Sequence, residues 1–143
     1  MNPIRPWLFI GKYRETKNLS LLQSTGIDAM LQLAEWVEQP GIASLYLPVQ
    51  DGEPLPFHLL RRGLAFITTH HAEQHRVLVA CGAGISRSAA FATAAIKEIE
   101  SLGILDALRA VKHAHPQAMP HMALWESLCT YYQENVPFEG TLF

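Results

Sequence analysis

The sequence has little cysteine and no excess of charge of one sign. Its 143 residues include two cysteines, Cys81 and Cys129, and carry a formal net charge of −2. Two cysteines so far apart argue against a disulfide framework and favour a reducing compartment. The absence of a basic run argues against a surface that binds nucleic acid.

Long apolar runs are also missing. No stretch approaches the length of a membrane span, and the apolar run at residues 7–10 is too short for a signal peptide. Repeats, low-complexity tracts and domain linkers are not visible either. Because 49% of the residues are hydrophobic, the chain can bury a core of its own. We expect residues 1–143 to form one cytoplasmic, monomeric domain without a membrane or nucleic-acid partner.

What the sequence does contain is an alternation of short strands and helices. Expected strands cover residues 8–11, 27–33, 44–49 and 76–80. Expected helices cover residues 18–24, 57–75 and 89–99, followed by one that stops near His115 and a last one between Pro120 and Pro137. This alternation predicts an α/β fold, with a central, mostly parallel sheet flanked by helices.

One stretch, residues 77–88, carries the strongest chemical signal. An apolar strand leads to Cys81, a loop with two glycines follows, and Arg87 precedes an Ala-rich segment of high helix propensity. Such a loop can turn its backbone N–H groups inward and hold an anion at the helix N-terminus. Arg87 adds a planar fork that matches two oxygens of a phosphate. A thiol in this cradle should be ionised near neutral pH and is placed to attack the bound phosphorus.

This stretch resembles a known signature. Cys81, five intervening residues, Arg87 and Ser88 are similar to the signature loop of the protein tyrosine and dual-specificity phosphatases. The likeness to the small, atypical dual-specificity group extends over residues 4–132. It implies the α/β fold of that family and hydrolysis of phosphate monoesters through a cysteinyl-phosphate intermediate, without a metal or another cofactor. The chain departs from the family at Ala80, where a histidine that helps to shape the loop usually stands.

The resemblance and the chemistry together assign the site residues. Cys81 is the expected nucleophile and Arg87 the expected phosphate clamp. By resemblance, the Ser88 hydroxyl should hydrogen-bond the sulfur and stabilise it as a leaving group, and helix capping is a rival role for it. Ser86 is expected to shape the loop. The loop residues expected to bind the phosphate are Gly82, Ala83, Gly84, Ile85, Ser86 and Arg87.

The leaving oxygen also needs a proton donor, for which Asp51 is the candidate. Asp51 follows an expected strand, in a loop rich in turn-forming residues, 30 residues before Cys81. Loops at the carboxyl ends of parallel strands meet at one edge of the sheet, where ligands bind. The resemblance also implies a general acid on such a loop. Glu53 is the runner-up, and a purely turn-forming role for Asp51 stays open.

Two other functions stand beside the phosphatase hypothesis. A rhodanese-like sulfurtransferase also uses a cysteine in a loop before a helix, but it would not need Asp51, and its loop is typically shorter. Ala80 favours a non-catalytic phosphate-binding module. Cys81 and Asp51 argue against it, because such a module needs neither a thiolate nor an acid. The sequence does not distinguish a phosphorylated protein from another phosphomonoester as substrate.

A metal site is the last alternative. His70, His71 and His75 lie close together in the sequence, and the last two have the i, i+4 spacing of one helix face. The sequence offers no recognisable ligand set around them. We therefore interpret them as a solvated helix face and expect no metal.

Overall fold

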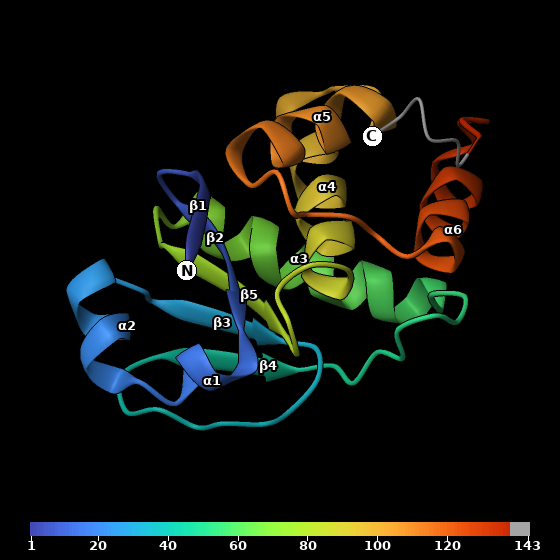
Figure 1. The fold of residues 1–143 in the computed structure, drawn as a ribbon. Helices are drawn as coiled ribbons and strands as arrows, with labels where there is room; N and C mark the ends of the chain where they lie inside the picture. Colours follow the sequence, from blue (N-terminus) through green and yellow to red (C-terminus); the bar gives the residue numbers. More distant parts are fainter. Residues whose placement is uncertain (138–143) are drawn as a thin grey trace.

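The structure is a computed structural model that describes residues 1–137. Within these residues, five strands form one sheet, and helices lie on both of its faces (Figure 1). The elements in chain order are β1 (Asn2–Arg5), β2 (Leu8–Lys12), α1 (Tyr13–Thr16), α2 (Leu19–Thr25), β3 (Ala29–Gln32), β4 (Ala43–Tyr46), α3 (Phe57–Ala72), β5 (Val77–Cys81), α4 (Arg87–Glu100), α5 (Ile104–Ala114) and α6 (Met122–Tyr132). Residues 138–143 of the expected domain lie outside the described residues.

The sheet is parallel except at one edge. Its strand order is β1-β2-β5-β3-β4, and β1 pairs with β2 in the antiparallel direction. The central strand is β5, in which Val77 has Leu8 of β2 on one side and Ala29 of β3 on the other. Every residue of β5 is buried, as expected for a parallel strand that is covered on both faces. The mostly parallel α/β sheet predicted from the sequence is confirmed.

Helices cover the two faces of the sheet unequally (Figure 1). On the side of α1 and α2 lies a small core that includes Leu22, Met30 and Ala80. On the other side, α3 to α6 enclose the main core, whose largest fully buried side chains are Trp125 and Phe91. Ala80, where the sequence departs from the signature that it resembles, is 2% exposed. Its methyl group therefore contributes to packing on the α2 side of the sheet.

Most expected elements are present with shifted ends. The helix expected at residues 18–24 is α2, which is capped by the Asn18 side chain and ends at Gly26 in the left-handed region (φ 78°). The helix expected at residues 57–75 is shorter, because α3 ends at Ala72 and Gln74 adopts φ 63°. The strand expected at residues 44–49 is the shorter β4. The sequence pattern does not predict α1, since four residues carry too little periodicity.

The carboxyl edge of the sheet brings two distant segments together. The loop to α4 starts at Cys81 at the end of β5, and the segment after β4 leads to Asp51. Val49 N–H donates to the Leu33 carbonyl oxygen (3.0 Å), which keeps this segment beside β3 after β4 has ended. Among residues 1–137, no helix combines the length and the apolar character needed to cross a membrane.

Candidate active site

Cys81 lies at the floor of the candidate site, as the last residue of β5. It is 3% exposed, and it pairs with Lys12 of β2 in the sheet. Its Sγ lies 3.2 Å from Oγ of Ser88, a fully buried residue in the first turn of α4. A hydroxyl at this distance can donate to an anionic sulfur. The pair therefore offers a thiolate a hydrogen bond that bulk water cannot easily replace.

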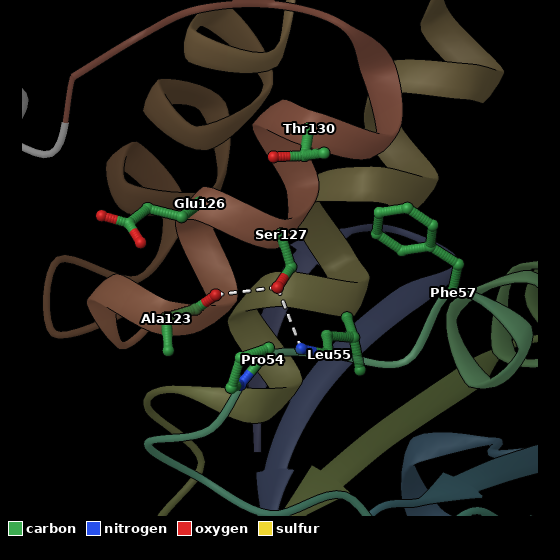
Figure 2. Close-up of a pocket in the computed structure, with 7 residues that line it drawn as sticks. All are labelled: Pro54, Leu55, Phe57, Ala123, Glu126, Ser127 and Thr130. Carbon is green, nitrogen blue, oxygen red and sulfur yellow. Dashed lines mark hydrogen bonds between the residues drawn. The ribbon is translucent and has the colours of Figure 1, made fainter.

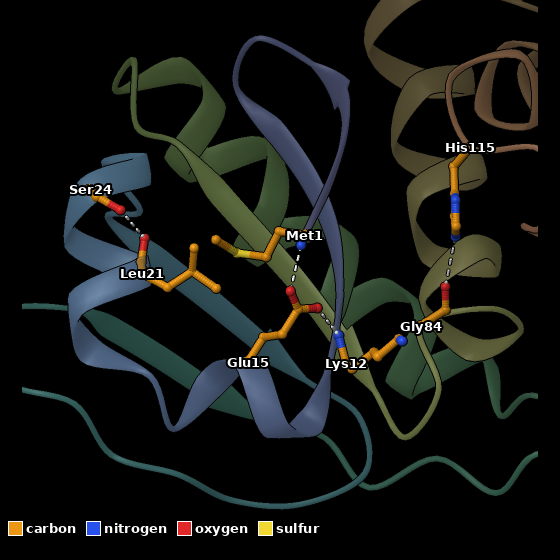
Figure 3. A network of polar contacts seen from close by, with 7 residues as sticks. All are labelled: Met1, Lys12, Glu15, Leu21, Ser24, Gly84 and His115. Carbon is orange, nitrogen blue, oxygen red and sulfur yellow. Dashed lines mark hydrogen bonds and ion pairs between the residues drawn. The ribbon is translucent and has the colours of Figure 1, made fainter.

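The loop after Cys81 packs tightly against β2. Gly84 has φ 70°, and a Cβ at this position would lie 3.0 Å from the Gly11 carbonyl oxygen, so a side chain here would be both strained and crowded. The Gly84 carbonyl oxygen accepts a hydrogen bond from Nε2 of buried His115 (3.1 Å, Figure 3). Because this carbonyl is held by His115, it does not turn into the loop. The arrangement favours N–H groups on the concave side, which suits an anion.

The Arg87 guanidinium folds back over the start of the loop. A Cβ on Gly82 would lie 3.1 Å from Arg87 Nη2, and Nη1 donates to the Val49 carbonyl oxygen (3.1 Å). The chain that leads to Asp51 therefore orients the guanidinium and leaves Nη2 beside the loop. Because α4 begins at Arg87, the positive end of the helix dipole adds to the same charge. The end of β5 is thus favourable for an anion.

Ser86 connects Asp51 to the loop. Its hydroxyl donates to Asp51 Oδ1 (2.6 Å) and accepts a hydrogen bond from the backbone N–H of His121 (2.8 Å). Asp51 itself is exposed, so this hydrogen bond, rather than packing, determines where its carboxyl group lies. Among the described residues, Asp51 makes this contact with the loop, whereas the exposed Glu53 does not.

The segment that follows Asp51 is anchored on α6. The backbone N–H of the buried Leu55 donates to Ser127 Oγ (2.9 Å), and this hydroxyl donates to the Ala123 carbonyl oxygen (2.9 Å, Figure 2). An open pocket of about 480 Å³ lies between this segment and α6, with Phe57 on its wall. Cys81 does not line this pocket. We therefore assign the anchor a role in holding the loop and the pocket no part in the chemistry.

An apolar wall borders the signature loop. Ile85, Met119 and Met122 are all exposed, and they line a shallow pocket of about 440 Å³ that also reaches Asp51 and His121. Met119 N–H donates to the Ile85 carbonyl oxygen (3.0 Å), which ties this wall directly to the loop. Exposed apolar side chains gathered beside a polar site are typical of a ligand-binding surface.

A second wall is basic. Lys12 and Arg14 line a pocket of about 350 Å³ that also touches Ala83 of the loop. The short α1 holds this corner, where Lys12 N–H donates to Glu15 Oε1 (2.8 Å) and the Met1 ammonium contacts the same carboxylate (Figure 3). Burial alone would raise the pKa of Glu15, but these hydrogen bonds hold it below its ordinary value. The carboxylate therefore stays ionised at neutral pH.

The structure joins predicted site residues in pairs, Cys81 with Ser88 and Asp51 with Ser86, and changes what is expected of the two serines. Ser88 lies inside α4 and contacts the sulfur, so it is not the helix cap. The N-cap position is occupied by Ser86, whose side chain makes no capping hydrogen bond. Ser86, expected only to shape the loop, also holds Asp51. Sequence reasoning missed His115, because a lone histidine 31 residues from Gly84 gives no local signal of contact.

The chain is similar in sequence and in fold to known proteins. The family model described as "Dual specificity phosphatase, catalytic domain" matches residues 8–134. Dual specificity phosphatase 28 of Mus musculus is 33% identical over 135 residues, which cover 91% of this chain and 82% of that protein. Dual specificity protein phosphatase 22 of Xenopus tropicalis is 29% identical over 140 residues, covering 95% of this chain and 66% of that protein. The crystal structure of human DUSP28 superposes with a TM-score of 0.85 at 29% identity and covers 93% of this chain and 96% of that one.

Several curated relatives are longer proteins, of which the chain spans about two thirds or less. The part that matches the family model runs from β2 to the end of α6 and so includes the whole Cys81 loop and the helix that follows it. Fold, signature loop and sequence agree over this span. The chain therefore belongs to the dual specificity phosphatase catalytic domain family, in the atypical group of the cysteine-based protein tyrosine phosphatase superfamily.

Proposed function

We propose that the protein hydrolyses phosphate monoesters on phosphorylated proteins through a cysteinyl-phosphate intermediate. The hydrogen bond from Ser86 to Asp51 carries this proposal, because it puts a carboxyl group beside the loop that begins at Cys81. A phosphate-binding module needs neither an acid nor a thiolate, and a sulfurtransferase does not need the acid. The relatives reported above are dual specificity phosphatases, which favours phosphate release over sulfur transfer.

In the first step, Cys81 Sγ attacks the phosphorus, so that an S–P bond forms while the P–O bond to the leaving group breaks. Asp51, protonated at this stage, gives its proton to the leaving oxygen. The backbone N–H groups of residues 82–87 and the Arg87 guanidinium hold the other three phosphate oxygens. Because the Val49 carbonyl already orients Arg87, little reorganisation is needed when the charge redistributes.

In the second step, water attacks the phosphorus of the cysteinyl phosphate. Asp51, now a carboxylate, takes a proton from this water, the S–P bond breaks, and inorganic phosphate leaves. The departing thiolate needs a donor, and Ser88 Oγ lies 3.2 Å from Sγ. Since water supplies the oxygen and Asp51 recycles the proton, the two half-reactions restore the starting enzyme.

We infer that the site accepts phosphate esters of aromatic and aliphatic side chains alike. The apolar wall of Ile85, Met119 and Met122 suits a tyrosine ring or an aliphatic flank. Lys12 and Arg14 suit acidic groups on the other side of the loop. The monomeric state, the cytoplasmic location and the lack of a nucleic-acid or membrane partner stay predictions from composition.

Turnover of p-nitrophenyl phosphate, phosphotyrosyl peptides and phosphothreonyl peptides tests the proposal. Cys81→Ser should abolish turnover and retain vanadate binding, because a neutral hydroxyl is a far weaker nucleophile in an otherwise unchanged cradle. Cys129→Ser is the matched control, since this half-buried thiol lies on α6 outside the loop, and it should keep normal turnover. Mass spectrometry of an acid-quenched reaction should find phosphate on Cys81.

Three results would overturn this assignment. Turnover that persists in Cys81→Ser would contradict the covalent mechanism. Vanadate binding without any turnover by the parent protein would indicate a phosphate-binding module. Sulfur transfer from thiosulfate without phosphate release would indicate a sulfurtransferase.

A further inference from the structure

Three side chains that can bind a metal ion gather where α3 ends and the chain turns toward β5. They are His70, Glu73 and His75, and one potential ligand atom from each lies within 4.8 Å of the others. The two Nδ1 atoms of the histidines are 2.8 Å apart, and Glu73 Oε2 lies 3.4 Å from His75 Nδ1. This cluster precedes β5, whereas Cys81 ends β5, so the whole strand separates the two sites.

The backbone forces the two histidines together. His75 N–H donates to the His70 carbonyl oxygen (2.9 Å) and Gln74 N–H to the His71 carbonyl oxygen (3.0 Å), the pair of bonds that defines a Schellman motif. In this motif the side chains of the positions occupied by His70 and His75 usually make an apolar contact. Here two imidazoles take that place.

The same turn separates His71 from His75, although their i, i+4 spacing in the sequence indicates one helix face. The i, i+4 pair His71 and His75 would share a face only if the helix continued through Gln74, but Gln74 has φ 63°. His71 instead packs its ring against Trp7, at a centroid distance of 4.2 Å. A glutamine in the left-handed region is unfavourable compared with glycine, so the turn retains a conformation that brings Glu73 and His75 beside His70 at some cost.

The donor set matches that of a transition-metal site. Two imidazole nitrogens and one carboxylate oxygen are ligands that Zn²⁺ accepts, with water as the fourth. Tetrahedral coordination with Zn–N bonds of about 2.0–2.1 Å requires ligand atoms about 3.3 Å apart. The distance from Glu73 to His75 already fits, and the two Nδ1 atoms would need to separate by about half an ångström. The His70 ring packs against Phe66, with the ring centroids 4.5 Å apart. His75 is therefore the residue that we expect to move.

We propose that His70, Glu73 and His75 form a binding site for a divalent transition-metal ion such as Zn²⁺. The bound ion would link the end of α3 to the segment that leads into β5. The site is open to solvent, since His75 and Glu73 are 38% and 55% exposed. Without a cation, one of the two Nδ1 atoms must act as a hydrogen-bond donor to the other across their 2.8 Å separation. A cation between the two Nδ1 atoms uses both lone pairs, and each imidazole then carries its proton on Nε2.

Calorimetric titration of the untagged protein with Zn²⁺ tests the site. The titration is performed on Cys81→Ser, which removes the loop thiolate as a competing ligand. We expect one site that loses at least tenfold in affinity in His70→Ala and in His75→Ala, with a smaller loss in Glu73→Gln because water can replace the carboxylate. His58→Ala is the matched control, an exposed histidine near the start of α3, and its affinity should be unchanged.

A second measurement does not depend on whether the histidine variants fold. In Cys81→Ser with all histidines present, Zn²⁺ should shift the imidazole NMR signals of His70 and His75 and leave that of His58 in place. Absence of saturable binding up to millimolar Zn²⁺ would overturn the proposal. So would an affinity that His70→Ala and His75→Ala leave unchanged, or one that His58→Ala weakens equally.

Discussion

Substitution of Ser86 and substitution of Ser88 should slow different steps of the proposed reaction. Ser86 Oγ contacts Asp51 Oδ1 at 2.6 Å, whereas Ser88 Oγ contacts Cys81 Sγ at 3.2 Å. The first contact orients Asp51, the proposed acid when the leaving group departs and the proposed base when water attacks the intermediate. The second stabilises the thiolate, which departs when the intermediate is hydrolysed. Ser86→Ala should therefore slow formation of the cysteinyl phosphate, and Ser88→Ala should slow its breakdown.

The expected sizes differ because the two contacts differ in burial. A hydrogen bond to a charged group contributes about 1.5–3 kcal/mol when water cannot replace it. Ser88 is fully buried, so Ser88→Ala should slow breakdown by about 10- to 100-fold. Asp51 is exposed and water can take over part of the Ser86 contact, so Ser86→Ala should lower the rate by about tenfold, less than the roughly 10²–10⁴ that a general acid supplies.

Pre-steady-state kinetics with phenyl phosphates of graded leaving-group pKa separates the two variants. Ser86→Ala should lose activity toward poor leaving groups and keep most of it toward p-nitrophenyl phosphate, whose phenolate needs little protonation. Ser88→Ala should show a burst of p-nitrophenolate followed by a slow steady rate that no longer depends on the leaving group. A loss in Ser86→Ala that does not depend on the leaving group, or the absence of a burst in Ser88→Ala, would refute this division of roles.

Three further predictions concern the acid, the core and the pH dependence of stability. Asp51→Asn should slow poor leaving groups by about 10²–10⁴ and p-nitrophenyl phosphate far less; equal losses on both would make Asp51 structural. Gly63→Ala should lower the free energy of unfolding by about 1–3 kcal/mol in urea, although helix propensity alone predicts a gain, because the new Cβ would lie 2.3 Å from the Phe91 ring; a stabilised variant would contradict the packing. The hydrogen bond from Lys97 holds the pKa of Glu134 below its ordinary value of 4.5, so its stabilisation is present above that value and is lost as the pH falls through the lowered pKa. Glu134→Gln should therefore lower the free energy of unfolding by about 0.5 kcal/mol at pH 7 and by progressively less below pH 4.5, as measured by thermal unfolding. A decrease that does not change with pH would exclude the ion pair as its source.

The sequence determined the features that depend on neighbouring residues. Cys81, the glycine loop and Arg87 are contiguous, so their strand–loop–helix setting could be predicted from local propensity alone. Asn18 and Gly26 marked the ends of α2 because capping is also a local interaction. The alternation of strands and helices then led to a mostly parallel sheet, since parallel strands need helical crossovers.

Only the tertiary structure decided which distant groups meet. Ser86 and Asp51 are 35 residues apart, and His115 and Gly84 are 31 apart; both contacts depend on how the loops at the edge of the sheet pack, which no local pattern encodes. The sequence pattern predicts a helix that is three residues too long at the end of α3, for a related reason. Gln74 has no strong preference for the left-handed conformation, so it is the tertiary turn into β5, rather than the residue itself, that ends the helix and folds His75 back on His70.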